Sequence, residues 1–156
     1  MSENDPDRRY LEDFEPGQTR TYGAYSLSEE EIVSFAEQYD PQPLHTDPDA
    51  AAESRYGGII ASGWHTIGVA MRLAVLEGYL QHLEVVAGVG VDDLRWTAPV
   101  HPGDTLSIRE EVLDTRPAAS DSELGLLRIE LSVTNQAGDQ VLTMVWIDLV
   151  ERREPA

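Results

Sequence analysis

The chain has 156 residues, 29 of them acidic and 11 basic, which leaves a formal net charge of −18 at pH 7. This length fits one domain with its own hydrophobic core, and such a charge would repel nucleic acids and anionic membranes, so we expect neither as a partner. The absence of cysteine excludes disulfides, thiolate nucleophiles and cysteine-bound metals.

The basic residues are all arginine, and the chain contains no lysine. Together with the net charge, this bias is typical of a protein adapted to high salt, where repulsion between surface carboxylates is screened. The alternative is an ordinary solvated acidic surface. The N-terminal stretch MSENDPDRRYLEDFEP is polar, and no apolar run is long enough to span a membrane. We therefore expect a cytoplasmic protein without a secretory signal.

The predicted organisation is simple. Residues 1–14 are acidic and irregular and predict a loosely ordered arm, residues 15–151 form a single domain, and residues 152–156 form a C-terminal tail. No internal repeat or linker interrupts the domain.

The first half of the domain predicts one short strand and then helices. The strand is expected at 19–25. The segment SLSEEEIVSFAEQYD predicts an amphipathic helix, because Ser28 and Glu31 form a capping-box pair ahead of apolar residues at helical spacing. Pro41 and Pro43 end that helix and predict an extended backbone beyond it.

Two more helices are expected before the sheet. Asp47 followed by Pro48 predicts the N-cap and first residue of a small helix that continues to Glu53. The segment SGWHTIGVAMRLAVLEGYL predicts the main helix, with Ser62 as its N-cap. Its apolar stripe is expected to comprise Ile67, Ala70, Met71, Ala74 and Val75.

After Leu83 the hydrophobic pattern changes to a period of two residues. This pattern predicts four long strands, at 85–96, 105–116, 124–135 and 140–151. The segment NQAGDQ between the last two predicts a hairpin loop. One strand, several helices and then four antiparallel strands indicate an α+β domain.

The segment YDPQPLHTDPDAA is the first candidate for chemistry. It places Asp40 and His45 five residues apart on a stretch that contains Pro41 and Pro43. A carboxylate and a neutral imidazole that converge can bind one water molecule and share its protons, and the prolines reduce the cost of positioning them. The alternative is a rigid surface turn, because Asp-Pro and His-Thr-Asp turns are common on surfaces.

Gly63 at the start of the main helix is the second candidate. Without a side chain it leaves its backbone N–H open to a ligand, and an N–H there stabilises developing negative charge, as on a thioester enolate oxygen. An acid–base pair and such a donor are the parts needed to add water across an α,β-unsaturated thioester. The alternative for Gly63 is simple backbone freedom before a helix.

Three motifs, YDPQPLHTDPDAA, GGIIASGWH and LRWTAPVHPGDTL, resemble those of the MaoC-like dehydratase family, which includes the (R)-specific enoyl-CoA hydratases. Asp40, Pro43, His45 and Ala51 fall on the family's hydratase motif. The resemblance covers about residues 15–150 and implies a hot-dog fold, in which a curved antiparallel sheet wraps a long central helix, paired as a homodimer.

The resemblance also implies roles. Asp40 and His45 would hold the catalytic water, with Asp40 as base and His45 as acid or the reverse, and the N–H of Gly63 would bind the thioester carbonyl. Gln42 departs from the family motif, which usually has asparagine there. Met71 departs from characterised hydratases that can carry a serine beside the aspartate, so another group must orient Asp40.

The leading hypothesis is therefore a hydro-lyase that acts reversibly on a 2-enoyl-CoA-type thioester and gives the (R)-3-hydroxyacyl product. The coenzyme A thioester is the substrate and no separate cofactor is expected. The alternatives are a hot-dog acyl-CoA thioesterase and a non-catalytic acyl-CoA binding module.

Further residues are expected at the substrate. Ser62 and Trp64 flank Gly63, and Trp64 can wall the acyl pocket or pack in the core or an interface. Arg95 is the selected candidate for the coenzyme A phosphates, with Arg55 and Arg72 as alternatives. No metal is expected, because the spacing of His45, Asp47 and His65 matches no standard metal motif.

Overall fold

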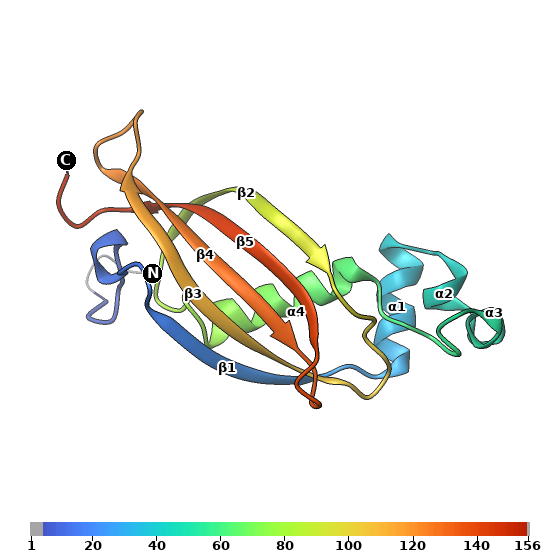
Figure 1. Cartoon of the computed structure of the whole chain (residues 1–156). Coiled ribbons are helices and arrows are strands. Elements are labelled where there is room, and N and C mark those ends of the chain that lie inside the picture. Colours follow the sequence, from blue (N-terminus) through green and yellow to red (C-terminus); the bar gives the residue numbers. More distant parts are fainter. Residues whose placement is uncertain (1–4, 156) are drawn as a thin grey trace.

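The computed structural model describes residues 5–155, and Figure 1 shows one curved sheet that wraps a long helix. The five strands lie in the order β1-β3-β4-β5-β2, and each of the four neighbouring pairs is antiparallel. Their bounds are Thr19–Ser26 for β1, Val85–Trp96 for β2, Thr105–Pro117 for β3, Leu124–Thr134 for β4 and Gln140–Glu151 for β5. The predicted α+β class is confirmed.

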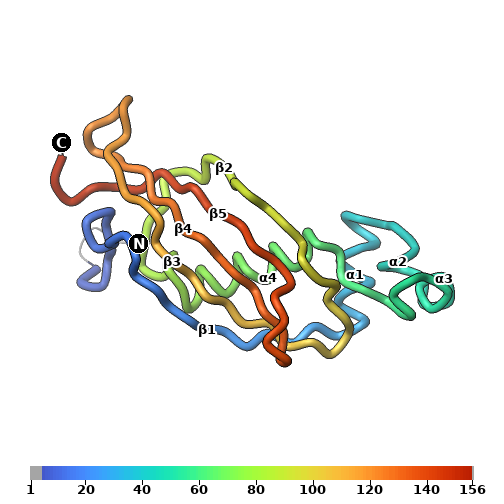
Figure 2. Tube along the Cα trace, viewed as in Figure 1, coloured from blue at the N-terminus to red at the C-terminus, as the bar shows by residue number. Residues whose placement is uncertain are grey.

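Helix α4, Gly63–Leu76, runs along the inner face of the sheet, and three shorter helices gather beyond its N-terminal end (Figures 1 and 2). These are α1, Glu29–Tyr39; α2, Pro43–Thr46; and α3, Pro48–Glu53. A short 3-10 helix, η1, spans Leu11–Asp13. Within the described part of the chain, every helix is too short or too polar to cross a membrane.

The core lies between α4 and the sheet. Alternate residues of β4 are fully buried, as the period of two residues predicts. The buried face of α4 differs from the predicted stripe: Val69 and Leu73 are buried with Ala70 and Ala74, whereas Val75 is 46% exposed. Each fully buried apolar side chain contributes about 1.5–3 kcal/mol, so this packing holds α4 firmly in place.

Residues 43–46 correct one expectation, because they form helix α2 and not an extended segment. Pro43 occupies the first helical position, where a missing N–H costs no hydrogen bond. The restriction that proline imposes falls on the preceding residue, and Gln42 is indeed extended, with φ −72° and ψ 143°. The short helix turns the chain back so that His45 faces the end of α1.

The N-terminal segment is more ordered than its composition predicts. Leu11 and Phe14 are only 6% and 3% exposed and belong to the core. Arg8 forms ion pairs with Glu84 and Glu151, which tie the segment to the start of β2 and the end of β5. Residues 1–4 of the predicted arm and residue 156 of the predicted tail lie outside the described residues.

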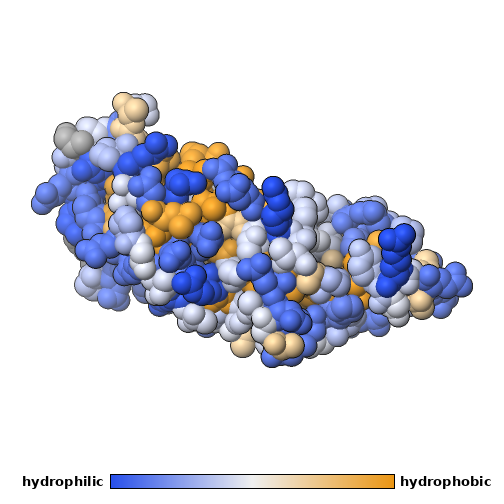
Figure 3. Space-filling view, viewed as in Figure 1, coloured by the Kyte–Doolittle hydropathy of each residue, from blue (hydrophilic) through white to orange (hydrophobic). Residues whose placement is uncertain are grey.

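Strand β2 is one edge of the sheet, and almost all of its residues are exposed. Three valines there, Val86, Val89 and Val91, are 43–53% exposed. Figure 3 shows hydrophobic patches between charged side chains on this part of the molecule. An apolar edge strand invites pairing with another chain, so this edge is a candidate for assembly.

Candidate active site

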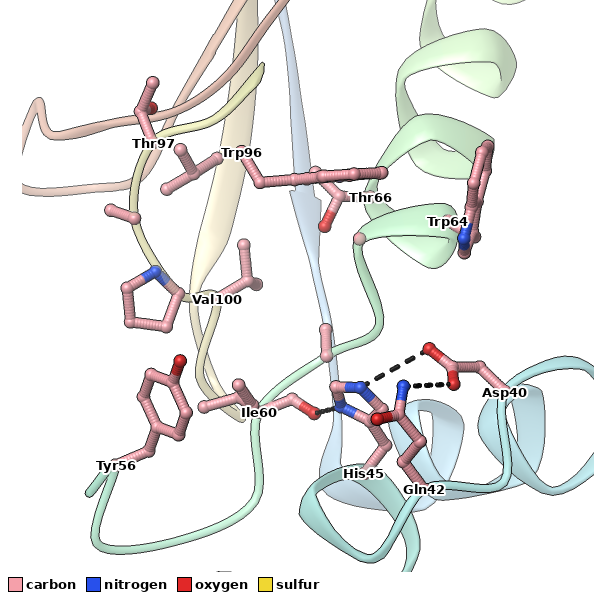
Figure 4. A pocket seen from close by; sticks show the side chains of 15 residues that line it. Asp40, Gln42, His45, Tyr56, Ile60, Trp64, Thr66, Trp96, Thr97 and Val100 are labelled. Atoms are coloured by element: carbon pink, nitrogen blue, oxygen red, sulfur yellow. Dashed lines mark hydrogen bonds and ion pairs between the residues drawn. The ribbon is translucent and has the colours of Figure 1, made fainter. Parts of the chain in front are cut away.

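A cavity of about 480 Å³ opens at the N-terminal end of α4 (Figure 4). Four segments supply most of its walls: the stretch that follows α1, the loop at 56–61, the first turn of α4, and the crossover from the end of β2 to residue 100, while Val141 of β5 completes the lining. Their members include Asp40, Gln42, His45, Gly63, Trp64, Thr66, Trp96 and Val100. The structure therefore brings the two candidates from the sequence, the Asp40 and His45 pair and Gly63, to one cavity.

Asp40 follows the last residue of α1 and projects its carboxylate toward the cavity (Figure 4). The side-chain amide of Gln42 donates to its Oδ1 at 2.8 Å, and the hydroxyl of Ser62 donates to its Oδ2 at 2.7 Å. These two hydrogen bonds, the Gln42 bond first, lower the pKa of Asp40 because they stabilise the ionised form. Ser62 and Gln42 are therefore the groups that orient Asp40 when position 71 is methionine.

His45 lies on α2 and is 7% exposed. Its Nδ1 is 2.7 Å from the carbonyl oxygen of Ile60, so Nδ1 carries the proton and donates it there. The other nitrogen, Nε2, is 3.4 Å from Oδ2 of Asp40. In the neutral imidazole Nε2 is an acceptor, as is the carboxylate, so a water molecule on the cavity side of the pair can donate one proton to each.

The first turn of α4 presents free backbone donors to the same cavity. Among residues 5–155, the N–H groups of Gly63 and Trp64 have no backbone partner, as expected for the first two residues of a helix. Ser62 is the N-cap residue but makes no capping hydrogen bond, because its hydroxyl is bonded to Asp40. A side chain at position 63 would collide with the indole of Trp96, so this close packing requires glycine.

A partly buried contact fixes α1 against α4. Nε2 of His65 lies 3.1 Å from Oε1 of Glu31, which also accepts a 2.6 Å hydrogen bond from the hydroxyl of Tyr25. The ring of Phe35 stacks on His65 at 4.6 Å. Glu31 is therefore not available to complete the predicted capping box, although Ser28 does cap α1. Because Asp40 follows the last residue of α1 and α4 begins at Gly63, this contact helps to set the spacing between Asp40 and Gly63.

Trp64 and Ser62, the predicted neighbours of Gly63, have different positions in the site. Trp64 lines the cavity and makes an edge-to-face contact with Trp96, with ring centroids 5.4 Å apart. Ser62 is fully buried and does not line the cavity; its hydroxyl donates a hydrogen bond to Asp40.

The predicted arginine contact with coenzyme A stays a prediction, because the three candidate arginines lie outside the cavity lining. Arg95 is exposed on β2 and donates to the neighbouring carbonyl oxygen of Leu94. It does not line the cavity, and neither do Arg55 and Arg72, which are also exposed. Any arginine contact with coenzyme A phosphates would have to form outside the cavity.

The three residues considered as metal ligands have separate tasks. Asp47 caps α3 by accepting hydrogen bonds from the N–H groups of Asp49 and Ala50. His65 pairs with Glu31 and His45 with Asp40. Their side chains therefore do not converge on a common position.

Sequence reasoning missed two residues that shape the cavity. Thr66 lies one turn after Gly63 on α4, and its hydroxyl points into the cavity (Figure 4). The spacing of three residues from Gly63 was a usable signal, because such residues share a helix face. Trp96 closes the cavity from the opposite wall, and nothing in its local sequence indicated that.

Comparisons with known proteins place this geometry in a family. The family model of the MaoC like domain matches residues 13–133. YdeM of Bacillus subtilis (strain 168), an uncharacterized protein, is 36% identical over 126 residues, which are 81% of this chain and 87% of that protein. The 3-hydroxybutyryl-CoA dehydratase of Methylorubrum extorquens is 31% identical over 138 residues, 85% of this chain and 78% of that protein.

The solved structures agree with the sequence match. The crystal structure of the MaoC-like dehydratase from Rhodospirillum rubrum has a TM-score of 0.83 and 33% identity, and the match covers 94% of this chain and 99% of that one. The long helix wrapped by an antiparallel sheet is the hot-dog fold. The chain belongs to the MaoC-like domain family of dehydratases.

Proposed function

We propose that the protein is a hydro-lyase that reversibly adds water to the double bond of a 2-enoyl-CoA-type thioester and gives the (R)-3-hydroxyacyl product. One observation carries the proposal: two hydrogen-bond acceptors, Oδ2 of Asp40 and Nε2 of His45, face each other at 3.4 Å in the cavity that also receives the free N–H of Gly63. A water-binding pair and a donor for an anionic oxygen are the groups that this reaction needs.

The lowered pKa of Asp40 suggests how the pair divides the work. A carboxylate that already accepts two hydrogen bonds is a weak base, so Nε2 of His45 is the better acceptor for the proton of water. Asp40 would then hold the second proton of the water and stabilise the imidazolium that forms. This is the reverse of the division that the sequence favours.

The reaction can be followed atom by atom. The water oxygen forms a bond to C3 of the substrate while one of its protons passes to His45. The electrons of the double bond move toward the thioester carbonyl, and the N–H of Gly63 stabilises the resulting enolate oxygen. The imidazolium then returns a proton to C2. One water has been added and the enzyme is unchanged.

The relatives support the reaction class without fixing the substrate. The Methylorubrum extorquens relative is named as a dehydratase of 3-hydroxybutyryl-CoA, the reverse of crotonyl-CoA hydration. The same pair and the same donor could instead direct water at the carbonyl carbon, which would make the protein a thioesterase.

The test measures loss of the enoyl-thioester absorbance of crotonyl-CoA while free thiol is monitored in parallel. We expect absorbance loss without thiol release, a product that an (R)-specific 3-hydroxyacyl-CoA dehydrogenase oxidises, and a loss of at least about a hundredfold in Asp40→Asn. Thiol release would assign a thioesterase instead. Binding of the thioester without turnover, by both proteins, would indicate a binding module.

We also propose that the protein acts as a homodimer formed along the edge of β2. The exposed valines of that strand, Val86, Val89 and Val91, support this interface. Light scattering should give a dimer mass for the wild type and a monomer mass for Val89→Asp. A monomeric wild type would refute the assembly but not the reaction.

A further inference from the structure

Thr66 is a buried residue whose hydroxyl faces the cavity. The residue is 2% exposed and lines the cavity. Among residues 5–155, no hydrogen-bond partner is found for its side chain, whereas the comparable hydroxyl of Thr97 on the opposite wall donates to the carbonyl oxygen of Gln140 at 2.8 Å. The hydroxyl therefore keeps its capacity to donate a hydrogen bond to a ligand in the cavity.

The usual internal partner for this hydroxyl is already engaged. A threonine within a helix can bond to the carbonyl oxygen four residues earlier, which here belongs to Ser62. That oxygen accepts the N–H of His65 at 3.0 Å and the N–H of Thr66 itself at 3.2 Å. The Thr66 hydroxyl instead points away from the helix and into the cavity (Figure 4).

Its position in the helix brings the hydroxyl to the donor already described. Side chains of a helix lean toward its N-terminus and cover the residue three positions earlier, which for Thr66 is Gly63. Gly63 has no side chain to intervene, and its N–H is free of backbone partners in the described chain. The Thr66 hydroxyl and the Gly63 N–H can therefore both donate hydrogen bonds to a ligand in the same region of the cavity.

We propose that the Thr66 hydroxyl and the Gly63 N–H donate to one substrate oxygen, the thioester carbonyl. The proposal rests on the proposed function in one respect, that the ligand is a thioester. The two donors gain strength as the carbonyl becomes an enolate, so their main effect is on the transition state. Thr66 gives its hydrogen bond without losing its proton, so the proton balance of the reaction is unaffected.

The first experiment compares Thr66→Val, Thr66→Ser and Thr143→Val with the wild type. Valine keeps the shape and removes the hydroxyl, serine keeps the hydroxyl, and Thr143 lies on β5 outside the cavity lining. For Thr66→Val we expect kcat with crotonyl-CoA to fall about a hundredfold with little change in KM. Its melting temperature should stay close to that of the wild type, because the hydroxyl makes no hydrogen bond within the described chain and valine keeps the shape of threonine. Thr66→Ser and Thr143→Val should keep near wild-type kcat.

A second measurement reads the hydrogen bond directly. Butyryl-CoA has no double bond to hydrate, and a 13C label at its thioester carbonyl isolates that stretch in the infrared spectrum. Binding to the wild type should lower the stretching frequency, and binding to Thr66→Val should lower it less. Thr66→Ser should restore the wild-type shift.

The two measurements separate this inference from the reaction class. If the wild type hydrates crotonyl-CoA but Thr66→Val matches it in kcat and carbonyl frequency, the role of Thr66 is refuted and the hydratase remains. If no protein turns over but the carbonyl shift depends on Thr66, the thioester site is supported and the hydratase is not. If butyryl-CoA shows no shift in the wild type, the inference is refuted.

Discussion

Asp40 and Asp148 lie at opposite ends of α4, and their pKa values are shifted in opposite directions. Hydrogen bonds from Gln42 and Ser62 lower the pKa of Asp40, which borders the open cavity. Burial raises the pKa of Asp148 to about 6, and its hydrogen bond from the hydroxyl of Tyr79 only partly offsets that rise. The ionised form of aspartate is thus stabilised at one end of α4 and destabilised at the other.

The C-terminal end of α4 holds a buried polar cluster, defined here as Tyr22, Tyr79, Glu110 and Asp148. The backbone N–H of Tyr79 and the hydroxyl of Tyr22 both donate to Oε2 of Glu110 at 3.1 Å. Burial raises the pKa of Glu110 as well. The cluster ties the chain after α4 to strands β1, β3 and β5, and its hydrogen bonds are made within the protein.

The contrast shows that ionisable residues in proximity do not by themselves make an active site. At the N-terminal end, Nε2 of neutral His45 faces another acceptor, Oδ2 of Asp40, and among residues 5–155 the N–H of Gly63 has no partner. At the C-terminal end, Tyr22 and Tyr79 donate hydrogen bonds to Oε2 of Glu110 and Oδ2 of Asp148. Unused hydrogen-bonding capacity beside a cavity is therefore the feature that marks the functional end.

The largest expected effect comes from replacing His45 with asparagine, whose amide can still donate to the carbonyl oxygen of Ile60. Loss of the proton acceptor should lower kcat about a thousandfold in the crotonyl-CoA assay. The matched change at the other end is Tyr22→Phe, which removes a hydroxyl from the buried cluster and should leave kcat unchanged. A comparable loss in Tyr22→Phe would break the distinction between the two ends.

Asp148→Asn should alter stability and not turnover. The folded pKa of Asp148 is about 6 against an ordinary 3.8, so the folded state holds this proton more tightly than the unfolded state. The associated stability is present below pH 4 and is lost as pH rises through 6, a loss on the order of 3 kcal/mol. Urea unfolding between pH 4 and pH 8 should show that decline in the wild type and a weaker one in Asp148→Asn. Identical pH profiles would contradict the buried-carboxyl assignment.

Ser62→Ala should release one oxygen of Asp40. Without that hydrogen bond the pKa of Asp40 should rise toward its ordinary value, so the acidic limb of the kcat profile should shift to higher pH. We expect kcat at neutral pH to fall about tenfold, as for loss of one hydrogen bond to a charged group. Ser54→Ala is the control, because that hydroxyl bonds to the carbonyl oxygen of Ala51. A lower kcat with no shift of the limb would argue against a role through Asp40.

The smallest of the four expected effects is that of salt, which should change the repulsion between surface charges but not the interactions of the buried cluster. Repulsion within a net charge of −18 extends about 10 Å at 0.1 M salt and about 3 Å at 1 M. The melting temperature should therefore rise by several degrees in molar potassium chloride, whereas the stability difference of Asp148→Asn should not change. A melting temperature independent of salt would refute the predicted adaptation.

Much of the fold could be predicted because its signals are local. The strands after Leu83 follow a period of two residues, and the starts of α1 and α3 carry Ser28 and Asp47 as caps. The start of the main helix after Ser62 was predicted correctly, but its C-terminal end and its buried face were predicted less well, because tertiary packing decides them. Leu11 and Phe14 were missed for the same reason: only contact with the sheet reveals that an acidic segment is anchored.

The candidate site divides in the same way. Asp40, His45 and Gly63 were accessible from motifs, and the structure brings them to one cavity. The bond from Ser62 to Asp40 joins residues 22 positions apart, and no spacing rule predicts it. Arg95 was selected by charge alone, and charge carries no information about direction.

The cavity is assembled from parts that can vary independently. Its reacting groups are carried by the helices, which the contact between His65 and Glu31 locks together. Much of the opposite wall comes from residues 97–100, a crossover that carries none of those groups. A change in this short loop would therefore reshape the cavity wall without replacing Asp40, His45 or Gly63. This crossover is where a library of variants should be concentrated.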